Sequence, residues 1–198
     1  MLREALTGLV LSGGRGRRMG GMDKGLVPYQ GRALVLYAVD ALRAHTDRIL
    51  VNANRNIGAY QELGYPVVSD PDSDFRGPLS GILAGMRAAS SRWMLTVPCD
   101  MPKVTGEILS RLLDVALESG DVSLLIAHDG ERLQPLLMLA STDLEESLED
   151  YLNSGGRRVD QWVETIPHRR VDLSHSRSAL VNFNDFDALD QPGSESHD

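Results

Sequence analysis

The sequence lacks the features that mark several large classes of protein. It contains a single cysteine, Cys99, so no disulfide bond can form within the chain. No segment approaches the roughly 18 consecutive apolar residues of a membrane-spanning helix, and residues 1–6 are too short in apolar run for a signal peptide. These absences predict a protein of the reducing cytoplasm that has no membrane partner.

Basic residues are also scarce. The chain carries 28 acidic residues against 20 lysines and arginines, which gives a formal net charge of -8. A protein that binds along the phosphate backbone of duplex DNA needs a broad positive surface. The charge balance therefore argues against a nucleic-acid partner, and it requires that an anionic ligand is met by a local group of basic residues.

What remains is an ordinary globular composition. At 198 residues, of which 42% are hydrophobic and 24% charged, the chain is long enough for one α/β domain with a large buried core. Residues 191–198 (Q-P-G-S-E-S-H-D) contain no apolar residue that could anchor them, so we expect them to form a disordered tail. The predicted domain covers residues 1–190.

Short apolar runs alternate with segments of helical periodicity along the chain. This alternation is typical of βαβ units and predicts a single-domain, Rossmann-like, three-layer α/β/α fold with a mainly parallel, twisted sheet. The predicted strands are residues 7–12, 48–53, 66–69, 93–97, 122–127, 133–140, 171–172 and 179–183. The predicted helices are residues 33–45, 77–89, 104–119, 143–152, 157–164 and 185–189.

Polar residues stand where the first four predicted strands end. They are Ser12, Asn52, Asp70 and Asp100. One such residue by itself is an ordinary way to stop a strand and begin a turn. In open parallel sheets, however, ligands bind outside the carboxyl ends of the strands, so the four together indicate a binding site at this edge.

The loop after the first strand is the most informative segment. Residues 11–24 (L-S-G-G-R-G-R-R-M-G-G-M-D-K) contain five glycines and four basic residues. Glycines let backbone N–H groups converge on phosphate oxygens, and Arg and Lys supply positive charge. A dinucleotide fingerprint would need glycine in place of Met19, and a Walker A loop would need Ser or Thr in place of Gly25. The segment therefore predicts a phosphate site of another type.

Several motifs together resemble a known family. They are the glycine-rich loop, V-N-A-N-R at 51–55, G-P-L-S-G at 77–81, P-C-D-M-P at 98–102, L-Q-P at 133–135, G-R-R at 156–158 and V-N-F-N at 181–184. These segments are similar to those of the molybdenum cofactor guanylyltransferases, within the wider nucleotidyltransferase superfamily, and the resemblance extends from about residue 6 to about residue 190. It implies transfer of GMP from GTP to the phosphate of molybdopterin, which yields the dinucleotide cofactor and pyrophosphate.

The resemblance also implies a set of nucleotide-binding residues. They are Leu11, Ser12, Gly13, Gly14, Lys24, Asn52, Asp70 and Asp100. The backbone of residues 11–13 would hold the nucleotide, although Ser12 replaces an alanine usual at this position. Lys24 would contact the phosphates, Asn52 and Asp70 the nucleoside, and Asp100 both the GTP and a Mg²⁺ ion. Partners of the protein would be GTP, molybdopterin or its molybdenum form, and transiently the proteins that make or receive the cofactor.

The chemistry of nucleotidyl transfer agrees with these residue types. Attack on the α-phosphate expels pyrophosphate, so catalysis consists mainly of positioning and of neutralising the leaving group. Lys24, with Arg18 behind it, suits that role. Mg²⁺ usually takes one or two carboxylates, which Asp100 supplies, and Asn182 or Asn184 could offer a second oxygen.

Other candidate groups are expected to be structural or to lie at the acceptor. The acceptor phosphate has a second pKa near ~6 and needs no strong base, and none of the five histidines falls in a motif loop. Cys99 is expected to be a small core residue. Arg157 and Arg158 are either contacts for the pterin phosphate or solvated surface charges.

Two kinds of alternative stay open. Within the enzyme class, a molybdopterin cytidylyltransferase or another small nucleotidyltransferase would resemble loops of the type L-A-A-G-x-G, whereas this chain has Gly13 in place of the second alanine. The resemblance associates the wider loop with the larger purine base. The other alternative is a nucleotide-binding regulator without activity, and the presence of both Lys24 and Asp100 argues against it.

Overall fold

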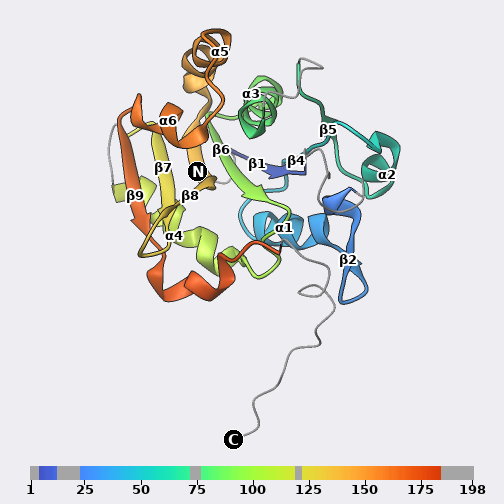
Figure 1. Ribbon diagram of the computed structural model, residues 1–198. Coiled ribbons are helices and arrows are strands. Elements are labelled where there is room, and N and C mark those ends of the chain that lie inside the picture. The colour runs from blue at the N-terminus through green and yellow to red at the C-terminus, as the bar shows by residue number, and fades with distance from the viewer. Residues whose placement is uncertain (1–4, 13–22, 72–76, 119–121, 184–198) are drawn as a thin grey trace, which may run out of the picture.

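A seven-stranded sheet forms the centre of the molecule (Figure 1). The computed structural model describes residues 5–12, 23–71, 77–118 and 122–183. The strands are β1 (Leu6–Leu11), β4 (Ile49–Asn52), β5 (Val67–Val68), β6 (Trp93–Pro98), β7 (Leu124–His128), β8 (Leu133–Ser141) and β9 (His168–Asp172). Their order in the sheet is β5-β4-β1-β6-β8-β7-β9.

The sheet is parallel except around one strand. β5, β4, β1 and β6 pair in parallel, as do β7 and β9, whereas β8 runs antiparallel to both β6 and β7. The mainly parallel α/β fold expected from the sequence is therefore confirmed. Because β8 runs in the opposite direction, β7 again points the same way as β6, and the turn after β7 lies at the same edge as the ends of β1, β4 and β6.

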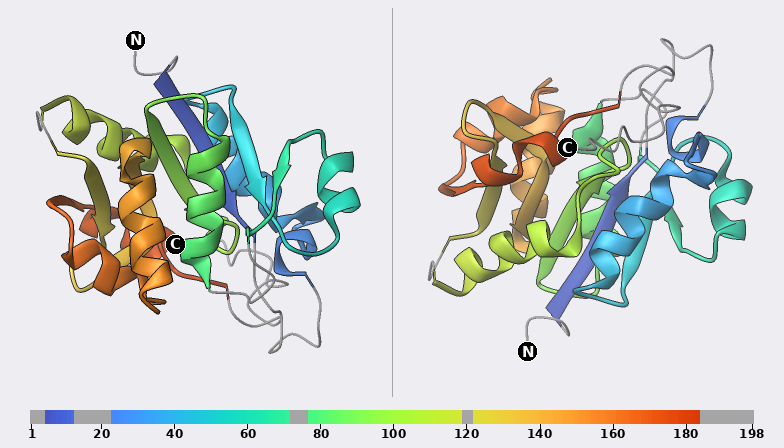
Figure 2. Two further views of the ribbon diagram at one scale, coloured as in Figure 1. Left: turned by 90° about the horizontal axis from the view of Figure 1, so that it is seen from above. Right: turned by 90° about the horizontal axis from the view of Figure 1, so that it is seen from below.

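Helices cover both faces of the sheet. They are α1 (Leu34–Arg43), α2 (Ile57–Glu62), α3 (Pro78–Ala88), α4 (Gly106–Glu118), α5 (Glu145–Asn153) and α6 (Val159–Glu164). α3 and α5 lie over one face and α1 and α4 over the other, as the two views of Figure 2 show. No helix within the described ranges is both long enough and apolar enough to cross a membrane.

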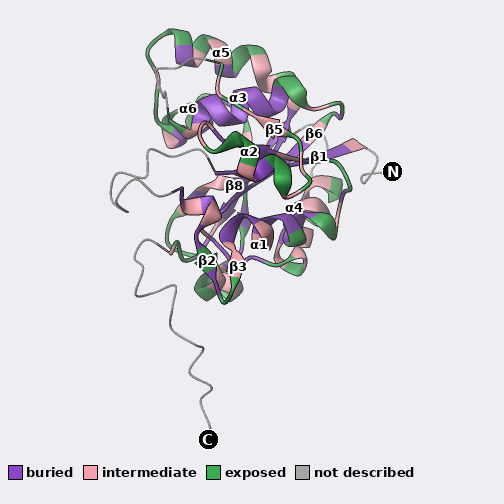
Figure 3. Cartoon of the chain, turned by 90° about the vertical axis from the view of Figure 1, so that its right-hand side faces the viewer, coloured by how far each residue is buried: buried purple, intermediate pink, exposed green. Residues whose placement is uncertain are grey.

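Alternating side chains of the strands feed two separate cores. In β1, Leu6 and Val10 pack with α1 and α4, whereas Leu9 and Leu11 pack with α3, α5 and α6. This is the alternation that a strand buried on both faces requires. Figure 3 shows the buried residues concentrated in the sheet and in the helices that flank it. Trp162 of α6 is fully buried in the second core, as a packing residue should be.

Helix α3 begins and packs as its sequence predicts. Gly77 adopts a positive φ of 85° and Pro78 occupies the first turn, where its missing N–H costs nothing. A Cβ atom built on Gly85 would lie 2.5 Å from Leu9 Cδ2. The absence of a side chain there lets the helix approach β1 closely.

Four short elements were missed by the sequence analysis. They are the hairpin of β2 (Pro28–Tyr29) and β3 (Arg32–Ala33), the 3₁₀ turn η3 (Lys24–Leu26) and helix α2. The hairpin did carry a signal in the sequence, because a glycine in a two-residue turn favours a tight hairpin. In the structure both turn residues, Gln30 and Gly31, have positive φ. Helix α2 has only six residues, too few for a periodic pattern.

The predicted strand at residues 179–183 is wrong. Residues 174–179 form a 3₁₀ segment, η5 (Ser174–Ala179), and residues 180–183 are irregular. The chain leaves the sheet after Asp172, and Phe183 packs its ring against Tyr29, outside both main cores. The expected helix at 185–189, the end of the expected domain and the expected tail at 191–198 lie outside the described residues.

Candidate active site

The carboxyl ends of four parallel strands meet at one edge of the sheet, and predicted site residues gather there. Leu11, the last residue of β1, is in register with the last residues of β4 and β6. Ser12 follows directly, and its backbone N–H donates to the carbonyl of Asn52 at 3.0 Å. Asp70 and Asp100 each lie two residues beyond the end of a strand. The sequence prediction that these residues share one edge is confirmed.

Lys24 and Asp100 form an ion pair across this edge. Lys24 Nζ lies 2.9 Å from Asp100 Oδ2, and each side chain is 21% exposed. They are separated by 76 positions in the chain, so only the fold brings them together. The pair joins the end of the glycine-rich segment to the end of β6, which places a cation and a carboxylate where a ligand entering from solvent can reach both.

Asn52 and Asp70 form a second polar pair at the same edge. The Asn52 side-chain amide donates to Asp70 Oδ1 at 3.0 Å and to the Val68 carbonyl at 3.2 Å. The Asp70 backbone N–H donates in turn to Asn54 Oδ1 at 2.8 Å. Burial raises the pKa of Asp70, against the lowering effect of its hydrogen bonds to the two asparagines. The hydrogen bonds therefore only partly offset the free-energy cost of removing the Asp70 carboxylate from water.

Glycine at position 81 is what allows Asn52 to sit at this edge. Asn52 is 2% exposed, and a Cβ atom on Gly81 of α3 would lie 2.2 Å from Asn52 Oδ1. A distance this short means that any side chain at position 81 would displace the Asn52 amide. The G-P-L-S-G motif thus has a packing role in holding a candidate nucleoside contact.

Ser12 is buried with its hydroxyl unmatched. It is 8% exposed, and among the described residues its Oγ has no hydrogen-bond partner. The Tyr60 hydroxyl and the Cys99 thiol lie near enough for the Ser12 hydroxyl to affect their pKa values, and a polar ligand atom would give this hydroxyl the partner that buried hydroxyls normally have. Three other predicted site residues, Gly13, Gly14 and Arg18, lie outside the described residues.

The residue before Lys24 belongs to a cluster that the sequence analysis missed. Asp23 is 9% exposed, and it accepts hydrogen bonds from Tyr60 Oη at 2.5 Å and from Asn56 Nδ2 at 3.3 Å. Both donors belong to α2 or to the residue preceding it. We call Asp23, Asn56 and Tyr60 the Asp23 clamp. Its only sequence signal is an acidic residue beside a predicted catalytic lysine.

The C-terminal V-N-F-N motif passes beside Asp100. The Phe183 backbone N–H donates to the Asp100 carbonyl at 3.0 Å, and the Phe183 ring lies 5.2 Å from that of Tyr29. Asn182 is therefore one residue from a direct backbone contact with Asp100. Asn184 lies outside the described residues.

Three of the histidines form hydrogen bonds with backbone groups. His45 and His168 contact the backbone carbonyls of Gly106 and Ile166, and His128 accepts the backbone N–H of Gly130. His175 is exposed, and His197 lies outside the described residues.

Cys99 is buried in the core beneath α1 and α4, as expected of a small core residue. Burial first, and then the neighbouring Asp100 carboxylate, raise the pKa of its thiol to about 12. A thiol with so high a pKa is a poor nucleophile at neutral pH.

The two arginines considered for the acceptor are held differently. Arg157 donates to the Leu152 carbonyl at 2.9 Å, and its loop lies against the start of α3, where a Cβ on Gly77 would be 3.8 Å from the Arg157 carbonyl. Arg158 forms a two-pronged ion pair with Asp160 on the surface. The backbone of Arg157 thus lies near the start of α3, while its guanidinium bonds to the carbonyls of Leu152 and Gly156.

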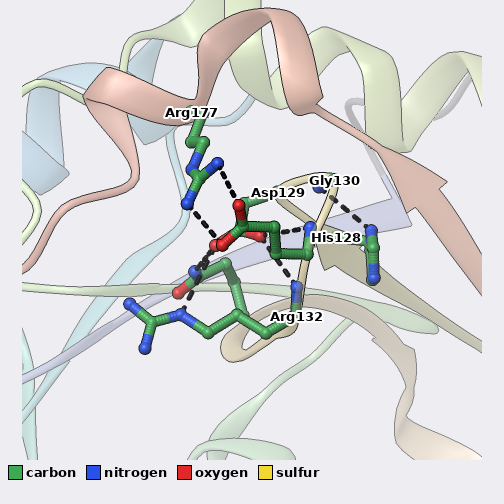
Figure 4. A network of polar contacts seen from close by, with 7 residues as sticks. His128, Asp129, Gly130, Arg132 and Arg177 are labelled. Atoms are coloured by element: carbon green, nitrogen blue, oxygen red, sulfur yellow. Dashed lines mark hydrogen bonds and ion pairs between the residues drawn. The ribbon is translucent and has the colours of Figure 1, made fainter.

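A polar network closes the turn between β7 and β8 (Figure 4). The Asp129 carboxylate accepts the backbone N–H groups of Glu131 and Arg132, each at 2.9 Å, and the Gln134 amide at 2.6 Å. Arg177 of η5 pairs with the Glu131 carboxylate. The Arg132 and Glu131 N–H groups and Gln134 together hold the pKa of Asp129 far below its usual range.

The carboxylates available at the edge fit a magnesium ion held jointly with a nucleotide. Among the described residues there is no group of three or more His, Cys, Asp or Glu side chains that could hold a metal by itself. Mg²⁺ differs from most metals in completing its shell with water and phosphate oxygens around one or two carboxylates. Asp100, a partly exposed carboxylate beside a candidate phosphate site, is suited to that arrangement.

Comparison with known proteins gives one consistent family. Residues 8–170 match the family described as "MobA-like NTP transferase domain". A molybdenum cofactor guanylyltransferase of Cupriavidus metallidurans is 42% identical over 199 residues, covering 98% of this chain and 97% of its own. The protein of that name from Methylibium petroleiphilum is 41% identical and covers 94% of each chain.

Solved structures show the same fold. The molybdopterin-guanine dinucleotide biosynthesis protein A of Archaeoglobus fulgidus superposes with a TM-score of 0.75 at 23% identity, covering 92% of this chain and 94% of its own. A 2-C-methyl-D-erythritol 4-phosphate cytidylyltransferase from Thermus thermophilus superposes with a TM-score of 0.68 at 15% identity, covering 91% and 94%. The fold is thus shared by proteins that differ in nucleotide and acceptor.

Proposed function

The chain belongs to the MobA-like NTP transferase family, and from this premise we propose that it transfers GMP from GTP to the phosphate of molybdopterin or its molybdenum form. The products are the guanine dinucleotide cofactor and pyrophosphate. The proposal includes the two substrates as partners, transient contacts with proteins that make or receive the cofactor, and a cytoplasmic location. The family supports the nucleotidyltransferase activity, and the name of the near full-length relatives, molybdenum cofactor guanylyltransferase, supports the choice of GTP and molybdopterin.

The observation that carries the proposal is the meeting of Lys24 with Asp100 at the strand-end edge. A lysine ammonium and a metal-binding carboxylate are the two groups that a triphosphate and its Mg²⁺ need in one place. In the free protein the two side chains neutralise each other. With GTP bound, Lys24 would turn to the phosphates, and Asp100, with Asn182 as a candidate second oxygen, would hold the Mg²⁺.

Lys24 would act on the leaving pyrophosphate. As the acceptor phosphate attacks the α-phosphorus, the bond to the β-phosphate oxygen breaks and negative charge grows on the pyrophosphate. An ammonium fixed near that charge stabilises the transition state more than the ground state. When bound, the Mg²⁺ supplies further neutralisation of the same charge.

Asn52 and Asp70 would hold the nucleoside. The Asn52 amide keeps the Asp70 carboxylate in place at 3.0 Å, and burial has raised the pKa of that carboxyl. A hydrogen-bond donor from the nucleoside would relieve this cost. The Ser12 hydroxyl and the backbone of residues 11–14 would contact the nucleotide nearby, and Arg18 would add to the charge on the phosphates.

The acceptor needs orientation more than activation. A phosphate monoester is already largely dianionic at pH 7, so no histidine base is required. Arg157, whose loop borders the start of α3, would supply a positive charge for this phosphate. Bringing two anions together is costly without such charges, because like charges repel strongly at short range.

A nucleotide panel followed by a turnover assay tests the proposal. Purified protein with Mg²⁺ and GTP at about 100 times Kd should gain about 2.7 kcal/mol of stability, whereas CTP, UTP and ATP at the same concentration should add much less. Pyrophosphate release should then depend on both GTP and molybdopterin. Preference for CTP would move the assignment to a cytidylyltransferase. GTP binding without pyrophosphate release would indicate a regulator instead.

A further inference from the structure

We propose that Tyr60 is a positioning residue for the transfer reaction: its hydroxyl fixes Asp23, and through Asp23 the short segment from which Lys24 reaches the phosphates. The proposal rests on the function proposed above and adds a role for helix α2 in it. Tyr60 contacts the residues on both sides of Lys24, by its hydrogen bond to Asp23 and by its approach to Gly25, so its effect on turnover would be transmitted through the backbone that carries the lysine.

The contacts within the clamp are short and buried. Tyr60 is fully buried, and its hydroxyl donates to Asp23 Oδ1 at 2.5 Å. Asn56, which adopts a left-handed conformation with φ 50° at the start of α2, donates to the other carboxylate oxygen at 3.3 Å. Each oxygen of a buried charge thus has its own donor. Hydrogen bonds to ionised groups are stronger than neutral ones, so the clamp holds the Asp23 side chain firmly against α2.

The position of Asp23 in turn helps to fix the position of the Lys24 backbone. Its carbonyl accepts the Leu26 N–H at 3.0 Å, and the Lys24 carbonyl accepts the Val27 N–H at 3.2 Å. These bonds define the single 3₁₀ turn that starts at Lys24. A lysine side chain is long and flexible, so the position of its ammonium depends on an anchored backbone. A displacement of about 1 Å in a reacting group can cost on the order of 100-fold in rate.

Gly25 allows the segment that carries Lys24 to pack closely against Tyr60, because there is no room for a side chain at this position. A Cβ atom at this position would lie 2.4 Å from Tyr60 Oη and 2.9 Å from Ser12 Oγ. The backbone next to Lys24 therefore lies directly against the Tyr60 hydroxyl and the end of β1. The tyrosine holds the lysine segment on two sides, by a hydrogen bond to Asp23 and by contact with Gly25.

Tyr60 is suited to positioning and unsuited to proton transfer. Burial first, and then the hydrogen bond to Asp23, raise the pKa of its hydroxyl well above the usual 10. The group therefore remains a donor to Asp23 throughout the neutral and alkaline range in which the enzyme would be assayed. Its contribution should not appear as a new pKa in the pH profile of kcat.

The test is a double-mutant cycle between Tyr60→Phe and Lys24→Ala. In the chain with Lys24 present, Tyr60→Phe should lower kcat for GMP transfer about tenfold or more and raise the Kd for GTP. In the Lys24→Ala background, Tyr60→Phe should change the Kd for GTP by less than about twofold, because the group being positioned is gone. Isothermal titration with GTP and Mg²⁺ gives this readout even where turnover is too slow to measure.

A pair of variants at Asp23 and a control at Thr46 separate positioning from other roles. Asp23→Asn keeps an oxygen to accept the Tyr60 hydroxyl, so it should retain far more activity than Asp23→Ala. If Asp23 were instead a metal ligand, both would fail alike. Thr46→Val removes another buried hydroxyl, which donates to the Leu6 carbonyl at 2.7 Å at the opposite end of β1, and it should lower stability without changing kcat or Kd.

Other results would overturn the inference. Equal effects of Tyr60→Phe on the GTP Kd with and without Lys24 would show that the tyrosine acts independently of the lysine. An unchanged kcat in folded Tyr60→Phe would show that the Tyr60 hydroxyl contributes nothing to turnover. Failure of the proposed function is a separate outcome, since the wild-type chain itself would then neither bind GTP nor release pyrophosphate.

Discussion

The two halves of the sheet carry polar residues at the same edge, and they differ in how completely those residues are partnered. Beyond β7, the Asp129 carboxylate receives two hydrogen bonds from its own turn and one from Gln134 of β8, and Arg177 closes the turn through Glu131. Beyond β1, β4, β5 and β6, the described groups include the buried Ser12 hydroxyl, which forms no hydrogen bond within the described residues, and the Lys24–Asp100 pair, in which each side chain is 21% exposed. The polar groups after β7 are partnered within the protein, whereas those at the other strand ends would gain partners from a bound ligand.

The pKa shifts of Asp129 and Asp70, one aspartate from each half of the sheet, have opposite signs. Backbone hydrogen bonds lower the pKa of Asp129, whereas burial raises the pKa of Asp70. The Ser12 hydroxyl has no partner among the described residues, and Lys24 and Asp100 remain 21% exposed while paired. Polar groups that the fold leaves undersatisfied are better functional candidates than equally buried ones that it satisfies. Variants on the two sides should therefore separate activity from stability.

The largest effect is expected for Asp100→Ala. Removing the candidate metal carboxylate should lower kcat by at least about 1000-fold, in the upper range found for groups that stabilise transition-state charge. Stability should change little, because the ion pair with Lys24 is partly exposed. Initial rates of pyrophosphate release and urea unfolding measure the two quantities. Asp40→Ala, which removes the partner of Arg32 on the surface, is the matched control, and near-normal turnover in Asp100→Ala would contradict the assignment.

Asp129→Ala should have the opposite profile. Loss of a buried acceptor of three hydrogen bonds should reduce the free energy of unfolding by about 3 kcal/mol at pH 7, while the Kd for GTP of the folded protein stays unchanged. The folded pKa lies below the unfolded value of about 3.9, so the stabilisation is present above that pH and is lost as pH falls through lower values. Urea unfolding should show a smaller difference from wild type at pH 3 than at pH 7. A large loss of GTP affinity in Asp129→Ala would contradict the assignment of this half of the sheet to stability and of the other half to binding.

Gly81→Ala should produce a smaller and more specific effect. The new methyl would overlap Asn52 Oδ1, so we expect the Kd for GTP to rise about tenfold, which corresponds to 1.4 kcal/mol. Gly58→Ala in α2 is the matched control, because a Cβ there meets nothing within 4 Å and helix propensity favours alanine by about 1 kcal/mol. Calorimetric titration of both variants decides the matter, and equal GTP affinities would remove Asn52 from the site.

Truncation after Asp190 should have the smallest effect. The removed segment, residues 191–198, has no apolar residue to bury, so the melting temperature should change by less than about 2 °C and kcat should be unaltered. Differential scanning calorimetry and the turnover assay check both. A substantial loss in either would mean that the C-terminus contributes to one of the two halves.

Much of the site could be predicted because it depends on strand ends. Apolar runs identified β1, β4, β5 and β6, and the residues that stop them are local features of the sequence. Parallel strands joined by crossovers must end at the same edge, so Asn52, Asp70 and Asp100 could be grouped without coordinates. The direct ion pair of Lys24 with Asp100 was not predicted, since residues 76 positions apart leave no local signal of contact; the resemblance gave each residue only a contact with the nucleotide or its metal.

The sequence by itself determined the family and most of the strands and helices along the chain, and it predicts a phosphate site in residues 11–24. Each of these depends on periodicity or on residues close in the chain. Only the tertiary structure decided that β8 runs antiparallel, that residues 179–183 leave the sheet, and that Tyr60 meets Asp23 across 37 positions. The physical reason is that such contacts are selected by long-range packing and by the satisfaction of buried polar groups, which no short window of sequence records.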